Sequence, residues 1–136
     1  MRKHILLLLF TVLWGINGFQ GYSKPNIQGD AITDISNHFK TGNTKGLSKY
    51  LSSSVNLSLM NNEYVYSKAQ SEIILSKFFK ENHPQSSSII HRLENKSNFQ
   101  HAVILLNTSK GDYRVAISLK SDKQLELIEI RIERSN

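Results

Sequence analysis

Residues 66–83 read YSKAQSEIILSKFFKENH, the longest stretch of the chain with a helical pattern. Ser67 and Gln70 have the spacing of a capping box, in which each residue satisfies a free backbone N–H at a helix start. Apolar residues then recur at helical spacing and predict one buried face, with charged residues opposite. The apolar set is Ile74, Leu75, Phe78 and Phe79. Pro84 follows and cannot continue a helix, so we expect a helix that buries two phenylalanines against a large surface.

Four strand-like segments after this helix supply that surface. We place them at residues 88–94, 99–108, 113–120 and 125–134, joined by short polar turns that predict antiparallel neighbours. Before the helix, the pattern predicts helices at 30–41 and 44–51 and a hairpin of strands at 55–60 and 64–66. This order indicates an α+β domain: N-terminal helices and one long helix packed on an antiparallel sheet of four main strands plus a short hairpin.

The N-terminus has the pattern of a secretory signal. Arg2 and Lys3 precede an apolar run at residues 5–14, which is shorter than the roughly 20 residues that span a bilayer. Small residues between Gly18 and Ser23 provide cleavage positions. We therefore expect a signal peptide at 1–22, a single domain at 23–136, and an exported protein, periplasmic or extracellular, without a stable membrane anchor after cleavage. A retained anchor helix is the alternative.

Composition excludes several kinds of site. The 136-residue chain has no cysteine, which excludes a disulfide framework, a thiol nucleophile and cysteine-ligated metals. Its net charge is +6, but the basic residues are scattered and form no stripe with interleaved aromatics. Nucleic-acid binding is therefore not supported. No glycine-rich phosphate loop and no GxSxG motif occur, so we expect no cofactor and no serine nucleophile.

Strand alternation predicts which side chains share a face of the sheet. The face toward the helices is expected to carry Tyr113, Val115, Ile117, Leu119, Ile128, Ile130 and Ile132. A tight turn before Phe99 would pair His91 with His101 and place both on this inner face. The outer face then has an apolar centre, which we expect a second copy of the chain to cover. The residues of this expected dimer interface are Ala102, Ile104, Leu106 and Ala116.

The inner face also holds the candidate pocket. Its expected lining is Phe78, Phe79, His91, His101 and Tyr113, with His38, Tyr64 and Tyr66 as further polar tips. The two histidines could ligate a metal, but no third ligand accompanies them, so we expect no metal. His91 with Tyr113 is the best acid–base pair, although no carboxylate falls on the inner face. Either Phe78 and Phe79 fill the space between helix and sheet, which we favour, or they line an open pocket.

Several motifs resemble known families. FKTGNTKGL at 39–47, followed by YL at 50–51 and a strand, resembles the opening of the NTF2-like (cystatin-like cone) superfamily. YSKAQ at 66–70, IH at 90–91, DYRV at 112–115 and IRIE at 130–133 are similar to the DUF4783 family of secreted Bacteroidota proteins. The resemblance implies a curved sheet wrapped round a helix, a conical pocket and dimers through the outer sheet face. The family supplies no catalytic residues, and the wider superfamily contains both enzymes and members that only bind.

These expectations combine into one leading function. We expect an exported, non-enzymatic NTF2-like domain that binds a small apolar ligand or a protein partner, as a homodimer. The apolar inner face with few ionisable groups motivates this expectation. The alternative is a cone-fold isomerase or hydrolase that uses His91 and Tyr113 as an acid–base pair.

Overall fold

A computed structural model describes residues 31–94 and 98–136 of the chain. The expected signal peptide at 1–22, the expected helix start at residue 30 and the turn at 95–97 lie outside the described residues. The described parts form helices and strands in the order that the sequence predicts, and the α+β class is confirmed.

The helices of the described part are α1 (Ala31–Thr41), α2 (Thr44–Ser48) and α3 (Lys68–Glu81). The capping box predicted for α3 is present. The backbone N–H of Gln70 donates to Ser67 Oγ at 3.2 Å, and the backbone N–H of Ser67 donates to Gln70 Oε1 at 3.1 Å. The buried face of α3 includes Leu75, Phe78 and Phe79, as predicted.

The strands are β1 (Leu51–Leu59), β2 (Asn62–Ser67), β3 (Pro84–Glu94), β4 (Phe99–Thr108), β5 (Gly111–Ser121) and β6 (Leu125–Arg134). They form one sheet in the order β2-β1-β6-β5-β4-β3. The four-stranded meander and the hairpin are both present, and they join because β1 pairs parallel with β6. This pairing satisfies backbone N–H and C=O groups that would otherwise be free on one edge of each strand.

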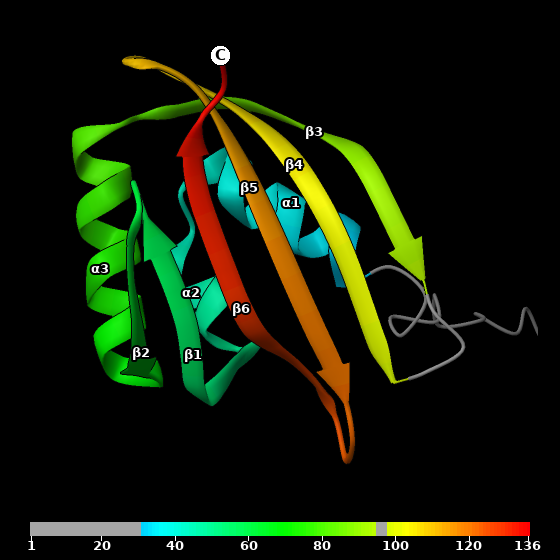
Figure 1. Ribbon diagram of the computed structural model, residues 1–136. Coiled ribbons are helices and arrows are strands. Elements are labelled where there is room, and N and C mark those ends of the chain that lie inside the picture. The colour runs from blue at the N-terminus through cyan, green and yellow to red at the C-terminus, as the bar shows by residue number, and fades with distance from the viewer. Residues whose placement is uncertain (1–30, 95–97) are drawn as a thin grey trace, which may run out of the picture.

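The sheet curves around the helices (Figure 1). In this view α1 and α2 lie behind the sheet, and α3 stands beside β2 at one end. Contacts between elements agree, since α1 touches β3 and β4 while α3 touches β1 and β2. We call the side that faces the helices the concave face and the opposite side the convex face. The hydrophobic core lies between the concave face and the helices.

The predicted faces of β4 are reversed. Ala102, Ile104 and Leu106 are at most 1 % exposed and lie in the core, so their expected place on an outer dimer interface is wrong. Leu106 pairs with Tyr113 and Ile104 with Val115, because a tight turn sets Thr108 opposite Gly111. The prediction took the face of β4 from its pairing with β3, whereas the pairing with β5 determines it.

A smaller correction concerns β6. Ile130 and Ile132 are buried as predicted, but Leu127 takes the inward position expected for Ile128. The register between β5 and β6 shifts at this point, which makes Ile128 the extra residue of a bulge.

Candidate functional site

Aromatic rings fill the space between α3 and the sheet. The ring of Phe78 lies 5.1 Å from that of Tyr113 and 5.7 Å from that of Phe79, and Phe79 lies 5.7 Å from Phe39. The Tyr113 hydroxyl donates to Asn82 Oδ1 at 2.7 Å, and Asn82 Nδ2 donates to the Phe78 carbonyl at 3.1 Å. The polar tip of Tyr113 is therefore occupied inside the core. Three of the predicted pocket residues, Phe78, Phe79 and Tyr113, pack on one another and fill the space where a pocket was expected.

The other two predicted pocket residues lie on the convex face. His91 pairs with Val103 across β3 and β4, and His101 pairs with Ser118 across β4 and β5. His101 Nδ1 lies 2.9 Å from Ser118 Oγ. Because alternate residues of a strand point to opposite faces, neither histidine shares the side of Tyr113. The predicted acid–base pair of His91 and Tyr113 is not formed, and His91 and His101 are not direct partners.

A polar cluster that the prediction missed joins α1 to α2. Asp34 Oδ2 accepts from the Tyr50 hydroxyl at 2.5 Å and lies 3.3 Å from His38 Nε2. Burial, followed by the hydrogen bond and the charge of Asp34, raises the pKa of Tyr50 from 10.0 to about 12. The spacing of Asp34 and His38, four residues apart in a helix, was a usable signal. The contact of Tyr50 depends on tertiary structure.

The remaining partners of His38 determine its tautomer. Asn43 Oδ1 accepts from the Gly46 N–H at 3.0 Å, so Asn43 Nδ2 faces His38 Nδ1 at 3.3 Å. Because an amide nitrogen only donates, His38 Nδ1 accepts and Nε2 carries the proton that points to Asp34. A Cβ at Gly46 would lie 2.3 Å from His38 Cε1. The cluster thus fixes α1 against α2 through satisfied polar groups, which is a structural arrangement.

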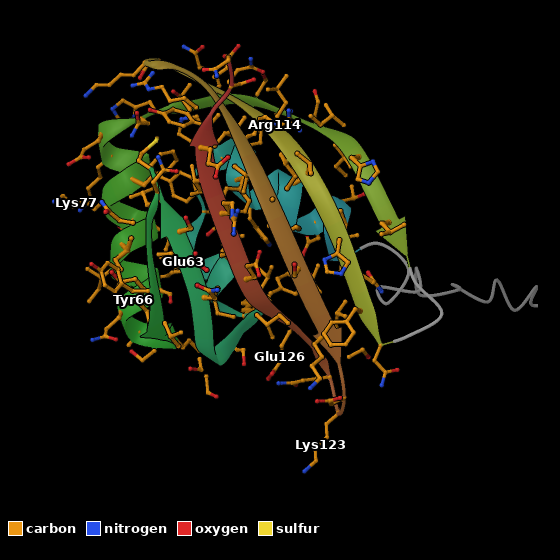
Figure 2. The ribbon with its side chains drawn as sticks, viewed as in Figure 1. Glu63, Tyr66, Lys77, Arg114, Lys123 and Glu126 are labelled. Atoms are coloured by element: carbon orange, nitrogen blue, oxygen red, sulfur yellow. The ribbon has the colours of Figure 1, made fainter. Side chains whose placement is uncertain are left out.

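A groove opens beside the filled interior, between α3 and the β1–β2 hairpin. Its volume is about 440 Å³. It is lined by Leu57, Leu59, Asn62, Tyr64, Tyr66, Ile74, Lys77, Phe78 and Glu81. The rings of Tyr64 and Tyr66 lie 5.9 Å apart in an edge-to-face arrangement. Figure 2 labels Tyr66 and Lys77 at this end of the molecule.

The convex face has an apolar half and a charged half. On β4, Phe99, Val103 and Leu105 are partly exposed between the buried residues of the concave face. On β6, Glu129, Arg131 and Glu133 alternate with buried isoleucines, as predicted. Between the two halves lies a hollow of about 360 Å³. Its lining is Val103, Arg114, Ala116, Arg131, Glu133, Arg134 and Asn136, and Figure 2 shows Arg114 on this face.

Two further findings bear on the kind of site. Within residues 31–94 and 98–136, no group of three or more histidine, aspartate or glutamate side chains is placed to hold a metal ion. No helix in the same two ranges is long and apolar enough to cross a membrane.

Comparison with solved structures identifies the fold. The chain matches an NTF2-like protein of unknown function from Cytophaga hutchinsonii with a TM-score of 0.57 and 10 % identity, over 76 % of this chain and 86 % of that chain. At this identity the match shows the fold alone, which is the curved sheet and helices of the NTF2-like superfamily. A comparison with curated proteins finds no match.

The family follows from a match to most of the chain. The family model described as a domain of unknown function (DUF4783) matches residues 32–133, so this chain belongs to the DUF4783 family. A DUF4783 family protein from Bacteroides ovatus is 26 % identical with a TM-score of 0.73, over 76 % of this chain and 94 % of that chain. One from Bacteroides uniformis is 23 % identical with a TM-score of 0.74, over 78 % and 98 %. The family and fold predicted from the motifs are confirmed.

Proposed function

We propose that the chain is an exported, non-enzymatic binding domain that works as a homodimer through the convex face of its sheet. The sequence left open a small apolar ligand or a protein partner. The contrast between the two faces of the sheet favours a protein partner over a small ligand. Phe78, Phe79 and Tyr113 fill the concave side, while the convex side leaves large apolar side chains exposed to solvent. Export is proposed from the N-terminal pattern, and recovery of the mature chain from the periplasm would test it.

The proposed interface centres on an apolar strip. The strip consists of Leu93, Phe99, Val103, Leu105 and Ala116, of which only Ala116 belonged to the interface expected from the sequence. Leu93 is 51 % exposed, and the other four are partly exposed. Register pairs connect the strip, since Leu93 is opposite His101 and Val103 is opposite Ala116. Burial of such a strip removes apolar surface from water, which drives association.

Charges beside the strip suit a second copy of the same chain. Arg114 pairs with Glu133 across β5 and β6, and Arg131 lies between Glu129 and Glu133 along β6. A two-fold axis through the face would bring the arginines of one copy over the glutamates of the other, because a two-fold interface uses the same patch twice. Alternating signs therefore make the face self-complementary. An apolar centre with a charged rim is also the usual anatomy of an interface.

Light scattering during gel filtration tests the dimer. The mature chain is expected to run as a dimer at micromolar concentration, and Leu105→Glu is expected to run as a folded monomer because the carboxylate would be buried without a partner. Gln124→Glu is the matched control: it adds the same charge at the exposed β5–β6 turn and is expected to stay dimeric. A wild-type chain that is monomeric at high micromolar concentration would contradict the proposal.

A further inference from the structure

We propose that the free edge of β2, together with the groove beside α3, binds an extended peptide segment of a partner protein. The added segment would continue the sheet, and its alternate side chains would enter the groove. This inference rests on the proposed binding function, but it uses a surface separate from the apolar strip of the dimer.

The β2 strand lacks the residues that usually protect the edge of a sheet. β2 is the outermost strand at one end of the sheet, so a row of backbone N–H and C=O groups points away from β1. Proteins usually protect such edges with proline, lysine, bulges or a covering element. The β2 sequence NEYVYS has no proline or lysine, and Tyr64 and Val65 are 61 % and 70 % exposed. The opposite edge, β3, begins with Pro84 and contains register shifts.

The groove lies on the concave side of the same strand. Tyr64 pairs with the buried residue Leu57, and Tyr66 pairs with Val55, so both tyrosine rings share the concave face. Ile74 and Phe78 of α3 also line the groove. A strand added to β2 would direct every second side chain toward this space. The volume of about 440 Å³ suits large apolar side chains, since ligand sites span about 300–1,000 Å³.

The tyrosine hydroxyls are available to such a peptide. Within the part of the chain that the structure describes, residues 31–94 and 98–136, no hydrogen bond involves the hydroxyl of Tyr64 or Tyr66. An exposed aromatic pair with free hydroxyls can pack on an apolar side chain and still donate to a backbone carbonyl. The side chains of Tyr64 and Tyr66 are therefore suited to bind a peptide in an extended conformation.

Charge indicates the sequence of the partner. Glu63 is the charged residue of β2 and is exposed. It lies on the convex face, opposite Ser58, and accepts a hydrogen bond from Asn56 Nδ2 at 2.7 Å. A lysine or arginine at the neighbouring position of an added strand would be attracted to this carboxylate. The occupant is thus an extended segment in which large apolar residues, facing the groove, alternate with basic residues.

A titration followed by nuclear magnetic resonance tests the proposal with a defined probe. The probe is a blocked peptide of alternating phenylalanine and lysine, TFKFKFT, added to the isotope-labelled chain 23–136. We expect saturable shifts confined to β2 and the groove, and slower hydrogen exchange of β2 amides. A scrambled peptide of the same composition and a peptide methylated on alternate backbone nitrogens are each expected to bind about tenfold more weakly. Equal binding of the methylated peptide would overturn strand addition.

Variants locate the site. Tyr64→Ala is expected to weaken binding about tenfold, because it removes one wall of the groove. Ile73→Ala is the matched control, since Ile73 is 69 % exposed on α3 and does not line the groove. Leu105→Glu is expected to bind the peptide normally as a monomer, which separates failure of the dimer from failure of this inference. Absence of saturable shifts at about 1 mM peptide, shifts on the apolar strip, or unchanged binding by Tyr64→Ala would overturn it.

Discussion

Asp34 connects side chains that are four and 16 residues away along the chain, His38 and Tyr50. The first contact follows from helical spacing, so it could be predicted. The second requires the turn after α2 to return Tyr50 to α1, and residue patterns carry no signal for it. The same limit applies to Tyr113, whose hydroxyl is held by Asn82, 31 residues earlier. Patterns identified Tyr113 as an inward-facing residue, but not the hydrogen bond that occupies its hydroxyl.

The raised pKa of Tyr50 predicts a specific dependence of stability on pH. Tyr50→Phe removes the hydrogen bond to Asp34 and is expected to lower the free energy of unfolding by about 1 kcal/mol at pH 8. The folded-state pKa of about 12 exceeds the ordinary value of 10.0. The stabilisation is therefore fully present below pH 10 and is lost as the pH rises toward 12.

Urea unfolding of both proteins between pH 8 and pH 12 checks this prediction. The difference in unfolding free energy between wild type and Tyr50→Phe should decrease between about pH 10 and pH 12. A difference that stays constant over the whole range would contradict the role assigned to Asp34.

At the scale of elements, local signals predicted the positions of α1, α2 and α3, although α2 ends at Ser48 and not at residue 51 as predicted. α3 begins after Ser67 because the capping box and the helical apolar spacing both lie within one short segment. β1 was predicted too short: it begins at Leu51, whereas the prediction began it at residue 55. Residues 52–54 are serines with no apolar alternation. Their strand conformation depends on neighbouring strands, which a local pattern does not contain.

The junction of α1 and α2 provides a test at this scale. Gly46→Ala places a Cβ 2.3 Å from His38 Cε1 and 2.8 Å from Asn43 Nδ2, so we expect a loss of about 2 kcal/mol in unfolding free energy. The loss should be much smaller in a His38→Ala background, where the overlapping ring is absent. Urea unfolding of the two single variants and the double variant measures this coupling. Additive effects would mean that the ring does not limit the space at Gly46. Lys45→Ala, an exposed change in the same helix, is the control.

At the scale of the whole molecule, β4 shows how strand pairing determines which face of a strand is buried. Its two faces are both apolar: Ala102, Ile104 and Leu106 on one, Phe99, Val103 and Leu105 on the other. Hydrophobicity alone therefore does not distinguish inside from outside. Pairing with β5 decides which face is inward, because it sets Ile104 opposite Val115 and Leu106 opposite Tyr113, both of which lie in the core. His101 moved from the expected pocket to the convex face for this reason.

Adjacent substitutions in β4 test this assignment. Ile104→Glu is expected to prevent folding, because it places an unpaired carboxylate at a position that is 0 % exposed. Leu105→Glu, one residue later, is expected to keep the native circular dichroism spectrum and a cooperative unfolding transition. If Ile104→Glu were a folded monomer and Leu105→Glu were unfolded, Ile104 would lie on the outer face, which would contradict the register described above.

The sequence by itself determined the helices, the meander, the α+β class and the family, because each depends on signals that are local or that recur in order along the chain. It also identified Leu75, Phe78 and Phe79 as buried residues of α3, whereas Ile74 is only partly buried and Ser71 was not predicted to be buried. Tertiary structure alone decided that the hairpin joins the sheet through β6, that Ala102, Ile104 and Leu106 face inward, and that Phe78, Phe79 and Tyr113 fill the interior. These outcomes depend on strand register and on the volume that packed side chains leave, and both are set by contacts between residues far apart in the chain.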